Sequence, residues 1–254
     1  SMNQGDDWQA ISDDLTRGGK KGNVAYGTLT AISESPFQFG LIYVGSDDGL
    51  VHITKNAGGS WENISKAFLK DLWVSRVIAS QHKKERVYVT LNGYRWDDFK
   101  TYVYVSEDYG ETWESISSNI PDSPVNVIRE DSENDNVLYL GTDNGAYVSF
   151  NKGEEWEAFS KGLPAVAVHD MVVQPEAKDL LIGTHGRSIY KTDIEPLQEM
   201  NAELMENNLT LFPVEDLAFS SRWGSSWSKW FEAYELSITI KFYSNVAGKK
   251  DVMV

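Results

Sequence analysis

Short runs in which apolar and polar residues alternate follow one another along most of the chain. Small, turn-forming residues separate them. Residues 41–45 and 50–54 flank Ser46-Asp47-Asp48-Gly49, and residues 137–141 and 146–149 flank Thr142-Asp143-Asn144-Gly145. Alternation with a period of two places successive side chains on opposite faces of a strand. The pattern therefore predicts antiparallel hairpins, and it continues to Thr192.

One eight-residue unit recurs between these runs. It reads Thr54-Lys55-Asn56-Ala57-Gly58-Gly59-Ser60-Trp61, Ser106-Glu107-Asp108-Tyr109-Gly110-Glu111-Thr112-Trp113 and Ser149-Phe150-Asn151-Lys152-Gly153-Glu154-Glu155-Trp156. Gly5-Asp6-Asp7-Trp8 is the tail of a further copy. Each copy lies between two strand-like runs, so we expect a hairpin turn whose hydroxyl and carboxylate or amide groups bond the turn backbone. Self-similarity at this spacing predicts a repeat architecture.

Grouped by repeat, the predicted strands form blades of four antiparallel strands, as in a β-propeller. Residues 24–65, 73–117 and 124–160 each hold a complete set, whereas residues 166–192 hold three strands. Residues 5–12 read as a lone last strand. They either complete the final blade, which would close four blades and remove an exposed sheet edge, or belong to an open arc cut from a larger propeller.

The pattern changes after Asp193, which divides the chain into predicted parts 1–195, 196–234 and 235–254. Leu197, Met200, Leu204 and Met205 follow helical spacing and predict a helix over 196–207. Residues 209–213 and 215–219 read as extended, 236–242 alternate as a strand, and 251–254 begin another. Trp223, Trp227 and Trp230 either pack against the propeller or stack on sugar rings.

The eight-residue unit resembles the Asp-box, or BNR repeat, of sialidases, other glycoside hydrolases and sortilin-type receptors. In those families the box is a structural turn on a propeller blade. The resemblance implies a structural role for the positions that carry it here: Thr54, Asn56, Gly58, Trp61, Ser106, Asp108, Gly110, Trp113, Ser149, Asn151, Gly153 and Trp156.

A longer resemblance covers residues 5–195. Trp73-Val74-Ser75-Arg76, Asn92 to Phe99, Val168-His169-Asp170-Met171 and Gly183 to Ser188 are similar to motifs of secreted bacterial proteins described as sortilin-like or BNR-repeat glycosyl-hydrolase-like. The resemblance implies an extracellular, periplasmic or cell-surface location. It also implies that residues 235–254 begin an Ig-like domain.

Composition narrows the classes of partner. The net charge of −15 argues against nucleic acid, and no apolar run is long enough for membrane insertion. Cysteine is absent, which excludes disulfides and a eukaryotic-type cysteine-rich module. Ser1-Met2 resembles a cloning remnant and the chain opens in mid-repeat, so we expect an excised fragment.

One connection departs from the plain turns. Residues 92–100 carry three aromatic side chains, an arginine and two carboxylates. Long loops on rigid scaffolds often carry binding groups, and exposed aromatics with arginine are typical of recognition surfaces. We therefore expect this loop and the turn 184–187 to lie on one rim, where ligand binds. The candidate ligand-binding residues are Trp73, Arg76, Tyr94, Arg95, Trp96, Phe99, His169, His185 and Arg187.

Catalytic chemistry has weaker support. Asp97, Asp98 and Asp170 are the candidate carboxylates for glycoside hydrolysis, which requires a pair about 5–10 Å apart. The arginines do not match sialidase motifs. His169 and His185 lack metal-site spacing, and we expect neither a metal nor a cofactor. His185 and Arg187 could instead bond loop backbone between blades.

The sequence thus predicts a non-catalytic propeller that binds protein or glycan. The alternative is part of a glycoside hydrolase whose site lies mostly on missing blades, and a purely architectural role is the third reading. The pattern does not set the oligomeric state.

Overall fold

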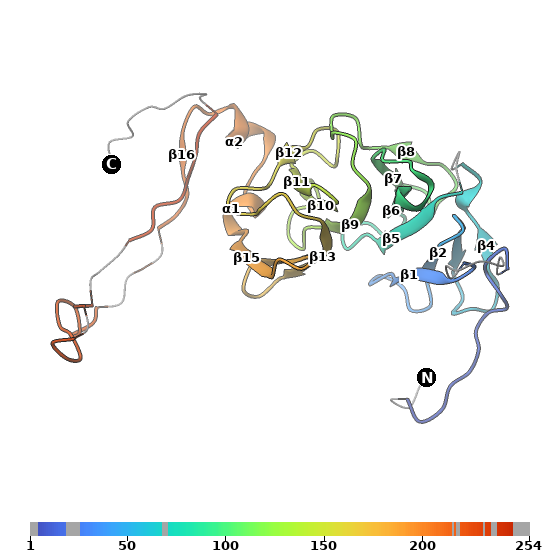
Figure 1. The fold of residues 1–254 in the computed structure, drawn as a ribbon, viewed down its shortest axis with the longest axis horizontal. Coiled ribbons are helices and arrows are strands. Elements are labelled where there is room, and N and C mark those ends of the chain that lie inside the picture. The colour runs from blue at the N-terminus through green and yellow to red at the C-terminus, as the bar shows by residue number, and fades with distance from the viewer. Residues whose placement is uncertain are drawn as a thin grey trace. The chain divides into compact units, whose positions relative to one another are not determined.

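The computed structural model describes residues 5–18, 26–67, 71–214, 216, 219–230, 232–234 and 238–245. The chain divides into two compact units, residues 1–198 and 199–254 (Figure 1). All four of the larger antiparallel sheets lie in the first unit.

Three sheets have four strands each, and a fourth sheet has three. The first is formed by β1 (Leu29–Glu34), β2 (Ile42–Ser46), β3 (Val51–Thr54) and β4 (Glu62–Asn63), and the second by β5 (Trp73–Ala79), β6 (Val87–Asn92), β7 (Tyr102–Ser106) and β8 (Glu114–Ser115). The third is formed by β9 (Val125–Glu130), β10 (Leu138–Thr142), β11 (Gly145–Ser149) and β12 (Glu157–Ala158), and the fourth by β13 (Val168–Gln174), β14 (Asp179–Thr184) and β15 (Ile189–Asp193).

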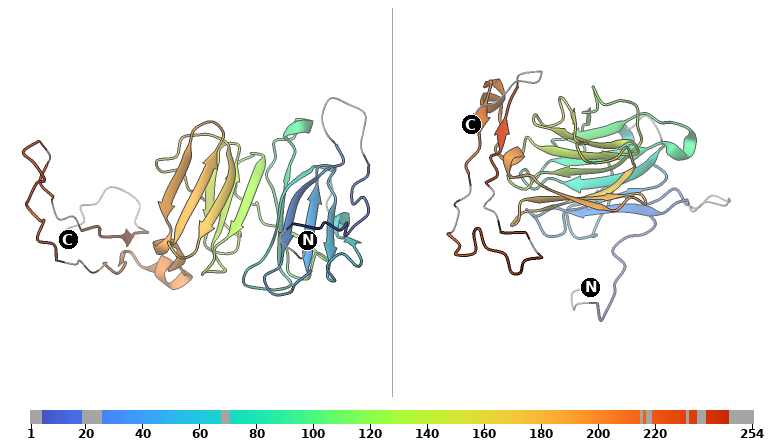
Figure 2. Two further views of the ribbon diagram at one scale, coloured as in Figure 1. Left: turned by 90° about the horizontal axis from the view of Figure 1, so that it is seen from below. Right: turned by 60° about the vertical axis from the view of Figure 1, so that its left-hand side comes forward.

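Within each sheet the strands follow sequence order, and the sheets stand face to face in succession (Figure 2). Inner strands of successive sheets contact one another, β1 with β5, β5 with β9 and β9 with β13. This arrangement confirms the predicted all-β architecture of propeller blades.

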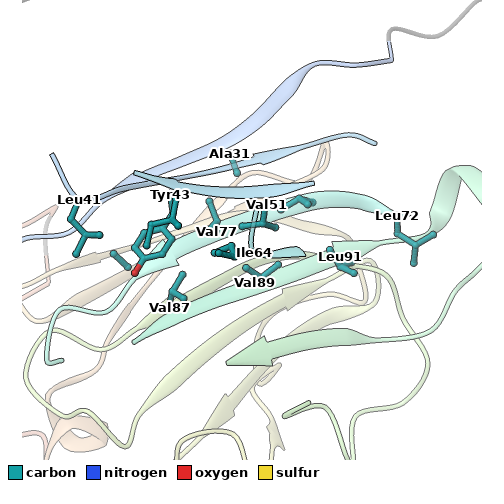
Figure 3. Close-up of a cluster of buried hydrophobic side chains, with 13 residues drawn as sticks. Ala31, Leu41, Tyr43, Val51, Ile64, Leu72, Val77, Val87, Val89 and Leu91 are labelled. Carbon is teal, nitrogen blue, oxygen red and sulfur yellow. The ribbon is translucent and has the colours of Figure 1, made fainter. Parts of the chain in front are cut away.

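The hydrophobic core lies between successive sheets. The cluster between the first and second sheets includes Tyr43, Val51, Val77 and Val89, and Figure 3 shows these side chains pointing into the layer between the strands. In the first three sheets the second strand is covered on both faces, and all six residues of β6 are buried, whereas β14 of the fourth sheet is only partly buried. That double burial explains why these strands read as nearly continuous apolar runs.

The three repeated turns share one hydrogen-bond pattern. In the second, Ser106 Oγ accepts the Gly110 N–H at 2.7 Å and donates to Asp108 Oδ1 at 2.7 Å. Asp108 Oδ1 in turn accepts the Thr112 N–H at 2.8 Å. Asn56 and Asn151 accept the equivalent N–H groups at 2.9 Å, so the turn needs an oxygen acceptor and no charge.

Each turn ends in a tryptophan that bonds to the preceding repeat. Trp156 Nε1 donates to the Ile116 carbonyl at 2.6 Å, Trp113 Nε1 to that of Ile64 at 3.0 Å, and Trp61 Nε1 to that of Ile11 at 2.8 Å. The isoleucine follows the tryptophan of its own repeat by three residues in every case. The tryptophans therefore link consecutive repeats in a ladder.

The prediction of a strand over residues 5–12 is wrong. These residues adopt no strand, and Ile11 lies against Gly58 and Trp61 of the first sheet. Among the described strands β15 pairs with β14 alone, so residues 5–12 do not close the fourth sheet. The Trp61 bond to the Ile11 carbonyl holds this segment at the opposite end of the row of sheets.

The second unit contains little regular structure. Instead of one helix over 196–207 there are α1 (Glu195–Gln198), which still belongs to the first unit, and α2 (Ala202–Glu206). Asn201 begins α2 by accepting the Leu204 N–H at 2.9 Å, which interrupts a continuous helix. β16 (Thr210–Leu211) pairs with β17 (Phe242–Tyr243), so within the described residues 238–242 of the predicted strand only Phe242 lies in a strand.

Several expectations fall partly or wholly outside the described residues. They are the strand beginning at 251, and residues 215, 217–218 and 236–237 within the predicted extended segments. Of the three tryptophans Trp223, Trp227 and Trp230, the last two are exposed. Trp223 is half-buried and packs edge-to-face with Phe219, with the ring centres 5.3 Å apart. No described helix is long and apolar enough to cross a membrane.

Candidate functional site

A cleft of about 600 Å³ opens where the first strands of all four sheets begin. Residues from each sheet line it, together with residues from the connections between strands. The first strands contribute Thr30, Trp73, Ser75, Arg76, Asn126 and His169. The connections and the positions next to them contribute Asn92, Tyr94, Asp143, Ala167 and His185.

A β-bulge occurs at the same level in all four first strands. In three of the strands the pairing register shifts by one residue, between Leu29 and Ala31, between Val74 and Arg76, and between Val168 and Asp170. In β9 the pairing passes from Val127 to Val125, so one residue of that strand has no partner in β10. The skipped residues are Thr30, Ser75, Asn126 and His169, and all four line the cleft. Bulges re-aim side chains and are over-represented beside functional sites.

Trp73 and Arg76 contribute hydrogen-bond donors that the protein itself does not use. Trp73 Nε1 and Arg76 Nε are buried and have no hydrogen-bond partner within the described residues. An unsatisfied buried donor costs about 1–3 kcal/mol, which makes these two groups unusual in a folded chain. The Arg95 guanidinium lies 4.9 Å from the centre of the Trp73 ring and stacks on it.

The connection 92–100 supplies one aromatic side chain to the cleft. It folds into a short 3-10 helix, η2 (Tyr94–Trp96), whose start is fixed by Asn92 Oδ1 accepting the Tyr94 N–H at 3.0 Å. Tyr94 is 61% exposed and lines the cleft. Phe99 packs edge-to-face with Tyr94, with the ring centres 6.0 Å apart, and this contact stabilises the position of the Tyr94 ring.

Charged groups lie beside the cleft. Asp170 Oδ1 accepts from Arg76 at 3.1 Å and from Arg129 at 2.9 Å, so one carboxylate balances two guanidinium groups. Burial lowers the pKa of Arg129, the neighbouring Arg76 lowers it further, and Asp170 opposes both effects. At Asp170 two guanidinium groups meet one carboxylate, and Asp143 adds a second carboxylate to the cleft lining.

Two histidines form the wall contributed by the fourth sheet. The rings of His169 and His185 lie 5.0 Å apart at a 35° angle. The His185 N–H donates to the Ala167 carbonyl at 2.9 Å, which fixes the β14–β15 turn against the start of β13. Among the described residues no group of three or more His, Asp or Glu side chains could hold a metal ion.

The structure brings together five of the nine candidate ligand-binding residues at this cleft: Trp73, Arg76, Tyr94, His169 and His185. Arg95 contacts Trp73 from outside the lining. The remaining three, Trp96, Phe99 and Arg187, are exposed and lie outside the lining residues.

The candidate carboxylates have different partners. Asp170 is held by the two arginines, whereas Asp98 accepts the hydroxyl of Tyr102, the first residue of β7, at 3.0 Å. Asp97 is exposed and has a positive φ of 55° at the end of η2.

Sequence reasoning missed the polar residues that complete the cleft, including Thr30, Ser75, Asn126 and Asp143. Asn126 Nδ2 donates to Asp143 Oδ1 at 2.9 Å, and Asn92 Nδ2 donates to Asn126 Oδ1 at 2.9 Å. The three polar groups form a chain across the second and third sheets. No local sequence signal marks Thr30, Ser75 or Asn126, because the bulge that directs each of them into the cleft shows only in the strand pairing.

A family profile matches the middle of the chain. The family is described as sortilin, neurotensin receptor 3 (Sortilin-Vps10), and the match covers residues 101–233, about half of the chain. No curated protein sequence matches the chain.

Solved structures with the same fold include a GH74 xyloglucanase from Xanthomonas campestris, at 14% identity and a TM-score of 0.53, with 65% of this chain and 29% of that chain covered. An ancestral GH74 enzyme shares 21% identity at a TM-score of 0.53, covering 67% of this chain and 25% of that one. YCF48 bound to D1 peptide shares 13% identity at a TM-score of 0.50, covering 66% and 52%. The chain thus spans about a quarter to about half of the proteins it resembles.

Proposed function

The chain belongs to the sortilin (Vps10) family, and on that premise we propose that it is a non-catalytic binding propeller. Its ligand, a protein or a glycan, binds in the cleft where the four first strands begin. The observation that carries this proposal is the convergence of all four bulge residues on one cleft beside two buried, unpartnered donors, Trp73 Nε1 and Arg76 Nε.

The cleft offers complementary kinds of contact. Tyr94 presents an exposed aromatic surface, which can pack on a sugar ring or an apolar side chain. Trp73 Nε1 and Arg76 Nε offer donors to carbonyl or hydroxyl oxygens, and Asp143 is bonded into the polar chain opposite them. A preformed cleft with a few convergent polar groups is the usual form of a ligand site.

The contacts of Asp170 favour binding over catalysis. Its Oδ1 accepts hydrogen bonds from Arg76 at 3.1 Å and from Arg129 at 2.9 Å. This oxygen is therefore engaged in positioning two guanidinium groups, one of which lines the cleft.

We extend the proposal to location. An extracellular, periplasmic or cell-surface bacterial protein accords with the resemblance of residues 5–195 to secreted bacterial proteins and with the acidic composition. Detection of the parent protein outside the bacterial cytoplasm, by fractionation and immunoblotting, would support this. Its recovery with cytoplasmic markers alone would refute it.

The binding proposal is tested by screening the chain against glycan and peptide arrays, followed by titration of each hit. Trp73→Phe keeps an aromatic ring but removes the Nε1 donor, and we expect roughly fivefold weaker binding, the worth of about 1 kcal/mol. Tyr94→Ala removes the aromatic surface and should weaken binding by about thirtyfold. Trp96→Phe is the matched control, because Trp96 lies in the same loop outside the cleft. The proposal would be overturned if neither array yields a binder. It would also be overturned if the affinities of the hits do not change in Trp73→Phe and Tyr94→Ala.

A second candidate function rests on Asp143. This carboxylate lines the same cleft that Asp170 adjoins, so two acidic groups are available for a glycoside hydrolase related to the GH74 enzymes that share the fold. Release of chromophore from a panel of aryl glycosides, lost in both Asp143→Asn and Asp170→Asn, would establish this alternative. Absence of turnover across the panel would remove it.

A further inference from the structure

The first strands of successive sheets bond to one another through side chains at their edges. β1, β5, β9 and β13 each lie at one edge of a sheet. From β1, Thr30 Oγ1 donates to the Val74 carbonyl of β5 at 2.8 Å. Ser33 Oγ of β1 accepts the Ala79 N–H of β5 at 3.0 Å. Side chains of the first sheet thus occupy backbone groups on the edge of the second.

The third and fourth sheets repeat this arrangement. Asn92 Nδ2 donates to the Val125 carbonyl of β9 at 3.3 Å, and Arg129 Nε donates to the Met171 carbonyl of β13 at 2.7 Å. A peptide that adds to a sheet as a new strand needs a row of free N–H and C=O groups along the edge. Such a row is interrupted at β5, β9 and β13, and the bulges beside the cleft break it further. These edges are therefore poor templates for strand addition by a peptide.

The charges in and beside the cleft are balanced. Apart from its two histidines, the charged side chains among the described lining residues are Arg76 and Asp143. Arg76 is paired with Asp170 at 3.1 Å. Beside the lining, Arg95 lies 3.8 Å from the buried carboxylate of Asp47. A strongly acidic or basic ligand would leave one sign of charge without a partner in a partly enclosed site, so the arrangement favours an uncharged ligand.

Asp143 offers the cleft an acceptor that the protein leaves available. Its Oδ1 accepts the Asn126 amide at 2.9 Å, whereas its Oδ2 accepts no hydrogen bond from the residues that the structure describes. The unpartnered Trp73 Nε1 is a donor in the same lining. A hydroxyl group both donates and accepts, so a ligand rich in hydroxyl groups can satisfy an acceptor and a donor of this kind together.

Tyr94 adds a flat apolar surface to these polar groups. Its ring is 61% exposed and is held in place by the edge-to-face contact with Phe99. The cleft volume of about 600 Å³ lies within the range of small-ligand sites, about 300–1,000 Å³. A stable contact with a folded protein would instead cover about 800 Å² of each partner. Size and lining together suit a short chain of sugar units.

We propose that the ligand of the cleft is an uncharged oligosaccharide. This inference rests on the proposed function and narrows its protein or glycan ligand to one chemical class. One sugar ring stacks on Tyr94 through its C–H face, and a hydroxyl group of the same chain donates to Asp143 Oδ2.

The test is isothermal titration calorimetry of the chain with three probes. They are neutral hexose oligosaccharides of increasing length, the matching oligosaccharides in which uronic acids replace the hexoses, and synthetic peptides. We expect the neutral series to bind at least about tenfold more tightly than the uronic acid series. Raising the salt concentration from about 50 mM to about 500 mM should change the affinity for the neutral series by less than about twofold, because an uncharged ligand has no ion pair to screen.

The probes separate failure of this inference from failure of the proposed function. Binding of peptides alone, or tighter binding of the uronic acid series, would overturn the inference and leave a binding propeller in place. Binding of none of the three probes would overturn both.

Two pairs of variants test the named contacts. Asp143→Asn should weaken binding of the neutral series about tenfold, because it removes a charged acceptor. Asp97→Asn is its matched control: Asp97 is an exposed carboxylate outside the lining, and its replacement should change the affinity by less than about twofold. Tyr94→Phe keeps the ring and should bind nearly as the wild type does, whereas Tyr94→Ala should lose about thirtyfold.

Folding of each variant is checked by far-UV circular dichroism. The Tyr94 pair keeps the proposal testable if Asp143→Asn does not fold. Affinity for the neutral series that is the same in Tyr94→Ala and Tyr94→Phe would contradict the stacking contact and overturn the proposal. Equal weakening by Asp97→Asn and Asp143→Asn would do the same for the Asp143 contact.

Discussion

The ladder tryptophans differ widely in burial, and the cost of removing each should follow that difference. Trp156 is 5% exposed, belongs to the cluster between the second and third sheets, and donates to the Ile116 carbonyl. Trp113 is half-buried with an equivalent bond, and Trp8 is 83% exposed. Alanine at these positions tests whether the ladder stabilises the fold as its geometry implies.

The magnitude can be estimated for each position. Truncating a fully buried tryptophan to alanine costs about 3–5 kcal/mol, so we expect about 4 kcal/mol for Trp156→Ala. Trp113→Ala should cost less than Trp156→Ala, since part of the Trp113 surface is already in water. Trp8→Ala should cost less than about 0.5 kcal/mol in the single chain. Trp156→Phe separates the contributions, because it keeps an aromatic ring and loses the hydrogen bond, worth about 1 kcal/mol.

Urea denaturation followed by far-UV circular dichroism measures these costs as shifts in the midpoint at constant slope. The expected order of destabilisation is Trp156→Ala, then Trp113→Ala, then Trp8→Ala. Equal costs at Trp156 and Trp8, or a Trp156→Ala cost below about 1 kcal/mol, would refute the view that the ladder links successive sheets.

Three further predictions concern the turns and the buried charges. Gly110→Ala should cost at least about 2 kcal/mol, because Gly110 has φ +92° and an added Cβ would lie 2.5 Å from Ile64 Cδ1. Gly162→Ala is the control, since Gly162 has φ +81° but open space around it. It measures the backbone strain alone and should cost less in the same denaturation assay. Burial raises the pKa of Asp108, but hydrogen bonds from Thr112 and Ser106 outweigh it and lower the pKa to about 2 from 3.8. The lowered pKa stabilises the folded state above pH 4, and this stabilisation is lost as the pH falls toward 2. After solvent screening it amounts to about 1 kcal/mol. Asp108→Asn should remove this part of the acid dependence of unfolding without breaking the turn. Glu130→Ala should cost about 3–5 kcal/mol in the urea midpoint, because buried Arg86 and Tyr88 lose a carboxylate that lies within 3.3 Å of both; a cost near zero would show that neither needs it.

The repeat spacing made the fold predictable. Each copy of Ser/Thr-x-Asp/Asn-x-Gly with its tryptophan marks the end of one sheet, and alternation supplies the strands between the copies. Residues 5–12 show where the same reasoning fails. Trp8 and Ile11 repeat the local pattern, but a strand forms only where another strand offers hydrogen bonds, and among the described residues no strand pairs with residues 5–12.

The candidate site was only partly predictable for a related reason. Trp73, Tyr94 and His169 stand out because aromatic and imidazole groups are unusual in turns and strand ends. Thr30, Ser75 and Asn126 do not stand out, because a polar residue at the start of a strand is ordinary. Only the bulge directs them inward, and a bulge is a property of strand pairing across the sheet, which local sequence does not encode.

The measurement that tests the binding cleft most directly is the indole N–H spectrum of the ¹⁵N-labelled chain with and without a ligand found on the arrays. Trp73→Phe assigns the Trp73 signal. We predict that this signal shifts on binding, because the buried Trp73 Nε1 gains an acceptor, while the signal of Trp156, already bonded to Ile116, stays in place. A Trp73 signal that is unmoved at saturation would contradict the account.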